Sequence, residues 1–312
     1  MSQPIRNQVA LAVALAAAAA LTACTGGGAP PFAGAGSGFQ APQLDGGLKP
    51  PKYLAVSEYS NVIVVLNGSY HELFTISEGL DDPQCVFYDR RGNLYAANPF
   101  AKIITEYNLQ GQQTFVYSGG FEPGCVTADR SGNVYVNGFN SQTQTSVIAE
   151  YRQRGIAPVT SCQVTFEAAG IAVDSKGDVF VTGRHGTGPG RFFEYKGGLR
   201  GCRARLLRFL TLSFPGGFRI DRHDDLVAAD MDCCVEIIAP PYRSITSIIT
   251  GAQLPVDVAL SESNSLIFIL DLEGKGDILV ATYPTGKILT TLGSSNGLYS
   301  PQGLATYPYL DD

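Results

Sequence analysis

Short apolar segments separated by polar turns recur along most of the chain, and they predict β-strands rather than helices. One phrase repeats: an apolar run, an Asp in four copies, a turn that contains Gly in three copies, then alternating aliphatic and aromatic residues. Strong copies cover residues 85–97, 125–137, 170–182 and 217–229, and weaker ones cover 257–269 and 303–307. An Asp side chain can cap a turn, Gly supplies positive φ, and alternation is the period of a strand. Each complete copy is therefore expected to be a β-hairpin.

The spacing of the copies predicts how the hairpins assemble. The aligned positions 89, 129, 174, 221, 261 and 307 are 40, 45, 47, 40 and 46 residues apart. A period in the forties with four short strands per unit is typical of a β-propeller. Third strands are expected at 103–107, 147–151 and 192–195, and a fourth at 113–117.

The two ends of the repeated region predict that the ring closes. The last copy ends after one strand, 303–307, whereas the region begins with 53–56, 62–65 and 72–75, which have the pattern of second, third and fourth strands. A C-terminal strand that joins the N-terminal blade would complete the ring and remove free sheet edges. We therefore predict an all-β fold, a six-bladed β-propeller over residues 48–312.

The repeated phrase resembles the NHL repeat, and the resemblance extends over residues 48–312. It implies a six-bladed propeller but not one activity, because similar propellers include sugar-lactone hydrolases, lyases and pure binding modules. The family often has Asn-His-Arg after the second strand. At that point this chain has Asn98-Pro-Phe, Asp230-Met-Asp and Asp271-Leu-Glu. The ligand class of the family is therefore not carried over.

The N-terminus predicts export. Residues 9–22 are almost all Ala, Val and Leu, and Arg6 precedes them. The run is shorter than the about 20 apolar residues of a membrane span, so it is typical of a signal peptide. Leu21-Thr-Ala-Cys24 resembles the lipobox of bacterial lipoproteins, which implies cleavage after residue 23 and a lipid on Cys24. The alternative is an ordinary signal peptide with a coincidental cysteine.

The segment after the predicted lipid site has a different composition. Residues 24–47 are rich in Gly, Ala, Pro and Ser without a hydrophobic period, which predicts a flexible tether. Thr25 stands where an inner-membrane retention signal usually has Asp, which favours the outer membrane, on its periplasmic side or at the cell surface. The expected domains are thus a signal peptide (1–23), a tether (24–47) and the propeller (48–312).

Charge excludes one class of partner. The 312 residues include 22 Lys and Arg against 28 Asp and Glu, a net charge of -6. A nucleic-acid partner would require a face that neutralises phosphates. We expect no nucleic acid, and we expect the membrane to be contacted through the lipid on Cys24.

Six cysteines remain for the folded part, and an even number in an exported protein permits disulfides. Cys85 and Cys125 have the same register on inner strands of adjacent blades. We favour a bond between them, with two buried thiols as the alternative. At least one further bond is expected among Cys162, Cys202, Cys233 and Cys234. A Zn or Cu site at the vicinal pair is disfavoured because no His is adjacent.

Loops after the second strands supply candidate ligand-binding residues at one mouth of the channel. These are Glu58, Asn98, Asn140, Arg184, His185, Asp230 and Asp271. Three of them are acidic, and the resemblance to lactonase-like propellers implies that such residues could hold one Ca²⁺ or Zn²⁺. The Asp-x-x-Gly turns lack the ligand pattern of an EF-hand. We interpret them as turn chemistry.

No nucleophile elbow, His-Glu-x-x-His motif or spaced pair of catalytic carboxylates is present in the sequence. We therefore predict a lipid-anchored propeller of the cell envelope that binds a protein, peptide or glycan, without a cofactor and without enzymatic activity. The alternative is a metal-dependent hydrolase or lyase of the lactonase-like type.

Overall fold

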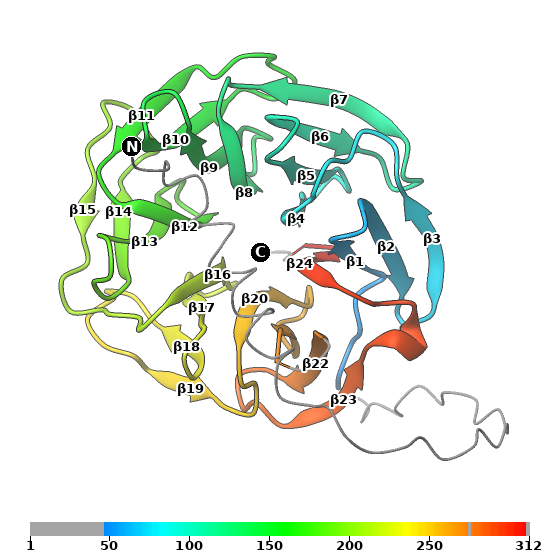
Figure 1. Cartoon of the computed structure of the whole chain (residues 1–312). Coiled ribbons are helices and arrows are strands. Elements are labelled where there is room, and N and C mark those ends of the chain that lie inside the picture. The colour runs from blue at the N-terminus through cyan, green and yellow to red at the C-terminus, as the bar shows by residue number, and fades with distance from the viewer. Residues whose placement is uncertain (1–46, 274–275, 310–312) are drawn as a thin grey trace, which may run out of the picture. The chain divides into compact units, whose positions relative to one another are not determined.

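The computed structural model describes residues 47–273 and 276–309 of the protein. Their strands form six four-stranded antiparallel sheets. The sheets are the blades of a ring around a central axis (Figure 1). The predicted all-β six-bladed propeller is therefore confirmed. The predicted signal peptide, Cys24 and tether lie outside the described residues, apart from Gly47. No helix among the described residues is long and apolar enough to cross a membrane.

The four strands of each blade follow one another from the channel to the rim of the ring (Figure 1). Blade 1 contains β24 (Pro301–Tyr307), β1 (Tyr53–Glu58), β2 (Val62–Asn67) and β3 (Glu72–Ile76). Blade 2 contains β4 (Cys85–Tyr88), β5 (Leu94–Asn98), β6 (Ile103–Tyr107) and β7 (Gln113–Ser118). Blade 3 contains β8 (Glu122–Ala128), β9 (Val134–Asn140), β10 (Thr145–Tyr151) and β11 (Thr160–Val164).

The second half of the ring has the same order. Blade 4 contains β12 (Glu167–Val173), β13 (Val179–Arg184), β14 (Arg191–Tyr195) and β15 (Arg205–Leu206). Blade 5 contains β16 (Pro215–Ile220), β17 (Leu226–Asp230), β18 (Cys234–Ile238) and β19 (Ser247–Ile249). Blade 6 contains β20 (Pro255–Leu260), β21 (Leu266–Asp271), β22 (Asp277–Thr282) and β23 (Ile288–Leu292), and the short 3-10 helix η2 (Ser294–Asn296) leads into β24.

The ring closes through the two ends of the described chain, as predicted. β24 pairs antiparallel with β1, from Tyr53 opposite Tyr307 to Glu58 opposite Pro301. The rings of Tyr53 and Tyr307 stack with centroids 6.0 Å apart. Every strand of the six blades lies between residues 53 and 307, within one compact unit.

The repeated Asp closes the first hairpin of a blade through its own carboxylate. In blade 2, Asp89 Oδ1 accepts hydrogen bonds from the backbone N–H groups of Arg91 and Asn93, at 2.9 and 2.8 Å. Gly92 takes the positive φ of 83° that the turn requires. Asp129, Asp174 and Asp221 bind turn N–H groups in the same way. This local chemistry explains why the repeat is visible in the sequence.

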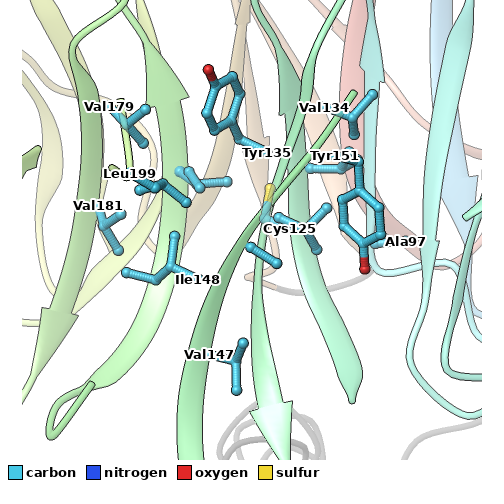
Figure 2. Packing of buried hydrophobic residues seen from close by; sticks show 14 of the residues in the cluster. Ala97, Cys125, Val134, Tyr135, Val147, Ile148, Tyr151, Val179, Val181 and Leu199 are labelled. Carbon is cyan, nitrogen blue, oxygen red and sulfur yellow. The ribbon is translucent and has the colours of Figure 1, made fainter. Parts of the chain in front are cut away.

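Hydrophobic side chains fill the space between neighbouring blades. Figure 2 shows Ile148 of blade 3 beside Val181 of blade 4, with Leu199 next to them. All three side chains have no exposed surface. Each sheet buries one face against the next, so the ring as a whole supplies the core that no single blade could form.

Two disulfides join blade 3 to its neighbours. Cys85 on β4 is bonded to Cys125 on β8, which connects the inner strands of blades 2 and 3 as the shared register predicted. Cys162 on β11 is bonded to Cys202, which connects the outer edges of blades 3 and 4. A third bond joins the neighbours Cys233 and Cys234 at the start of β18.

Candidate functional site

The structure places the predicted ligand-binding residues at equivalent points of the six blades. Glu58, Asn98, Asn140, Arg184, Asp230 and Asp271 end the second strands β1, β5, β9, β13, β17 and β21, and His185 follows β13. They lie at the end of each blade where the chain enters the inner strand. All seven therefore lie at or next to the ends of second strands.

Three carboxylates of this set bind backbone groups. Each accepts hydrogen bonds from two consecutive N–H groups in the segment that leads into the inner strand of its own blade. The donors are Tyr299 and Ser300 for Glu58, Ser213 and Phe214 for Asp230, and Gln253 and Leu254 for Asp271. The three residues are only 2%, 2% and 8% exposed. The carboxylates therefore fix the entry segments of blades 1, 5 and 6.

The electrostatics of Glu58 agree with this structural role. Burial raises the pKa of the Glu58 carboxyl, and the N–H groups of Ser300 and Tyr299 act in the opposite direction. Within residues 47–273 and 276–309, no group of three or more His, Cys, Asp or Glu side chains is arranged to hold a metal ion. Glu58, Asp230 and Asp271 are consequently not brought together around one point.

The other predicted residues differ in their exposure. Asn98 is fully buried; its amide oxygen accepts the Asp81 N–H at 3.0 Å and its amide nitrogen donates to Thr105 Oγ1 at 2.6 Å. Asn140 only caps its own hairpin, where it accepts the N–H groups of Gln142 and Thr143. Like the three acids, Asn98 thus accepts a backbone N–H group and holds a neighbouring segment in place.

Arg184 and His185 lie at the surface of blade 4. The Arg184 guanidinium is 4.1 Å from the centre of the Phe214 ring and pairs with Glu167 at 3.3 Å. His185 is exposed, and its ring meets the edge of Phe166 at 6.2 Å. The Arg184 guanidinium is thus already engaged by Glu167 and Phe214, whereas the His185 ring is open to solvent.

The opposite mouth of the channel, at the Asp turns, contains a pocket of only about 50 Å³. Its lining includes Arg90, Arg130 and Arg222, which follow the repeated Asp in three blades. The half-buried Tyr309 also lines it and packs on Phe87 with centroids 4.8 Å apart. A volume of this size holds one or two waters. The described side chains, Tyr309 among them, therefore leave little space at this mouth.

A larger hollow lies on the outer rim, between blades 4 and 5. This rim groove has a volume of about 660 Å³ and is lined by Arg205, Leu206, Leu207, Arg208, Phe209, Pro241, Tyr242 and Arg243. Leu207 and Tyr242 are buried at 4% and 7% exposure and form its floor, whereas Phe209 is 76% exposed. The Tyr242 hydroxyl donates to the Asp224 carbonyl at 2.9 Å, which holds the floor in place.

The two segments that line the rim groove are basic in an acidic protein. Residues 195–218 contain Lys196, Arg200, Arg203, Arg205 and Arg208 without any Asp or Glu, and residues 237–256 contain Arg243 without any Asp or Glu. Arg205 is paired with the buried Glu194. Arg208 and Arg243 form no hydrogen bond or ion pair with the described residues.

Sequence reasoning missed the rim groove because its segments lie outside the repeated phrase. Arg200, Arg203, Arg205 and Arg208 follow one another within nine residues, and this density was a signal in the sequence. What the sequence did not indicate is that the connection between β18 and β19 of the next blade brings Arg243 to the same hollow.

Comparisons with known proteins extend this description only at the level of fold. No family model matches the chain, and no curated protein matches its sequence. A crystal structure of a protein of unknown function from Bacteroides caccae is similar, with a TM-score of 0.63 and 16% sequence identity. The match covers 82% of this chain and 98% of that one. The class of the protein is therefore a six-bladed β-propeller, and the similarity does not define its partner or activity.

Proposed function

We propose that this protein is a lipid-anchored propeller of the cell envelope that binds a protein, peptide or glycan and has no enzymatic activity. The observation that carries the proposal is the use of Glu58, Asp230 and Asp271 as acceptors for backbone N–H groups. The acids that an enzyme of the lactonase-like type would use for a metal are here engaged in holding loops.

The repeat assignment is part of the same proposal. The Asp turn, the glycine with positive φ and the following strand of the NHL-like phrase recur in the first hairpins of blades 2, 3 and 4. We infer that the blades are NHL-type repeats. Propellers of this class expose loops from several blades on one face, which suits recognition of a macromolecule.

The anchor is proposed from the lipobox-like Leu21-Thr-Ala-Cys24. Disulfides such as Cys162–Cys202 are typical of exported proteins, which supports a location outside the cytoplasm. Cys24→Ala should abolish palmitate labelling and move the protein from the membrane fraction to the soluble fraction. Continued labelling of the variant would refute the anchor.

Binding without catalysis is tested with the purified propeller. Immobilised residues 47–312 should retain a component from cell-wall fragments or envelope protein extracts, and heat-unfolded propeller is the control. Elemental analysis and melting curves with added Ca²⁺ or Zn²⁺ test the alternative. One tightly bound ion with a clear rise in melting temperature would overturn the proposal in favour of a metal-dependent hydrolase or lyase, and so would the absence of any retained component.

A further inference from the structure

We propose that the rim groove between blades 4 and 5 docks onto the anionic headgroups of a membrane surface. This inference rests on the proposed function in one respect, because the lipid anchor is what brings the propeller to a bilayer. The groove would add a second contact, and it would decide which side of the ring faces the membrane.

The exposed side chains of the groove are those of an interfacial site. Phe209 is 76% exposed and Leu206 is 40% exposed. On the outer strand of the next blade and just before it, Ile248 and Ile245 are 52% and 39% exposed. β15 and β19, which carry Leu206 and Ile248, are the outer strands of adjacent blades (Figure 1). Apolar side chains beside arginines are the composition of surfaces that insert at the headgroup level.

The arginines at this edge favour the binding of a phosphate group. Arg208 and Arg243 reach the groove from two blades and are not engaged by the described residues. A guanidinium binds phosphate oxygens through two parallel hydrogen bonds, which suits a phospholipid headgroup. Neither lining segment contains an acid, and two carboxylates near Tyr242, those of Glu194 and Asp224, are paired with Arg205 and Lys176.

The rest of the protein strengthens the choice of a membrane over an acidic polypeptide. The chain has a net charge of -6, so an anionic bilayer repels most of its surface and attracts the basic edge. A propeller tethered to that bilayer is held at high effective concentration, so even a weak patch is occupied. The apolar side chains fit the acyl boundary, whereas a soluble acidic chain would leave Phe209 without a partner.

The experiment uses residues 47–312, which form the closed ring and lack the apolar N-terminus and Cys24. The protein is sedimented with vesicles of equal parts phosphatidylcholine and phosphatidylglycerol, and with vesicles of phosphatidylcholine alone. It should pellet with the anionic vesicles and be released by salt, because exposed charges are screened. Arg208→Gln combined with Arg243→Gln should lower the partition coefficient about 30-fold, since each arginine near an anionic surface contributes roughly 5-fold.

Two further variants separate the groove from general charge. Arg90→Gln combined with Arg152→Gln removes the same charge from exposed positions of blades 2 and 3, and should leave the partition coefficient within about twofold. Phe209→Ser should lower it on the order of tenfold, because the exposed ring loses its burial in the headgroup region. Circular dichroism confirms that each variant is folded.

Three results would overturn the proposal: no pelleting of the folded protein with the anionic vesicles, equal pelleting of the groove variant and its charge-matched control, or retention on immobilised polyglutamate without vesicle binding. The last result would identify an acidic polypeptide as the occupant. None of them bears on palmitate labelling of Cys24, so failure of the groove and failure of the anchor are distinguishable.

Discussion

Arg219 on β16 and Asp257 on β20 form an ion pair inside the propeller, with Nη1 and Oδ1 3.3 Å apart and side chains only 4% and 7% exposed. Both residues also bind Leu304 on β24. Arg219 donates to its carbonyl at 2.7 Å, and Asp257 accepts its N–H at 3.0 Å. Inner strands of blades 5, 6 and 1 are thus connected where the C-terminal strand closes the ring.

Replacement of Arg219 should therefore weaken the whole fold. Arg219→Met leaves Asp257 buried without its counter-charge, and a single broken partner of a buried pair costs about 3 to 5 kcal/mol. Urea denaturation at neutral pH measures the loss. Lys176→Met is the control, because Lys176 pairs with Asp224 at 3.4 Å but is 66% exposed, and such a pair contributes at most about 1 kcal/mol. Equal losses of stability in both variants would contradict a structural role for the Arg219–Asp257 pair.

Glu236 should make the stability of the propeller depend on pH. The residue is 6% exposed on β18, and burial, with a smaller contribution from the charge of Asp230, raises its pKa from 4.5 to about 7. The folded state then holds the proton more tightly than the unfolded state. The contribution of Glu236 to the free energy of unfolding is fully present below about pH 4.5, falls as the pH rises towards 7, and stays reduced above pH 7.

Glu236→Gln keeps the side chain neutral and should remove this loss. The variant should match the unmodified protein near pH 4.5 and exceed it by about 3 kcal/mol above pH 7, at 1.36 kcal/mol per unit of pKa shift. Thermal denaturation over this range is the measurement. A difference between the two proteins that does not change with pH would show that Glu236 titrates normally.

The disulfide Cys162–Cys202 should contribute stability through the chain segment it closes. The two cysteines are 40 residues apart, for which loop-closure entropy predicts about 4 kcal/mol. Replacement of both by alanine should lower the free energy of unfolding by about 2 to 4 kcal/mol. Cys233 and Cys234 are adjacent, so their bond closes no loop, and Cys233→Ser should cost less than about 1 kcal/mol. A larger effect of the vicinal pair would contradict the entropic explanation.

Asp230 should behave as a structural residue. Asp230→Ala removes the acceptor for the N–H groups of Ser213 and Phe214, and should destabilise the fold by about 2 to 4 kcal/mol because hydrogen bonds to charged groups are strong. Asn140→Ala removes a cap from an exposed hairpin and should change stability by about 0.5 kcal/mol or less. Denaturation curves compare the two. An unchanged midpoint for Asp230→Ala would mean that its carboxylate is available for another role.

The fold was predictable because its chemistry is local. A turn such as Asp89 to Asn93 is made by residues four positions apart, so the same residue types recur in the sequence wherever the same hairpin forms. The unequal ends of the repeat indicated that β24 joins β1. The strand alternation that packs Ile148 against the next blade is equally visible in sequence.

The roles of the candidate residues were not predictable in the same way. The repeat register locates Asp230 and Asp271 at strand ends, but only the folded chain shows that each carboxylate binds the segment entering its own blade. Glu58 binds residues more than two hundred positions away in the chain, because blade 1 is built from both ends.

The sequence by itself determined the blades, their number and the closure of the ring, since these follow from a repeated local pattern of turns and alternating strands. Tertiary structure alone decided which side chains meet across the repeats. The ion pair of Arg219 with Asp257 joins blades 5 and 6, and Arg208 and Arg243 line one groove from blades 4 and 5. Contacts of this kind depend on how the blades curve around the axis, and no local spacing encodes that curvature.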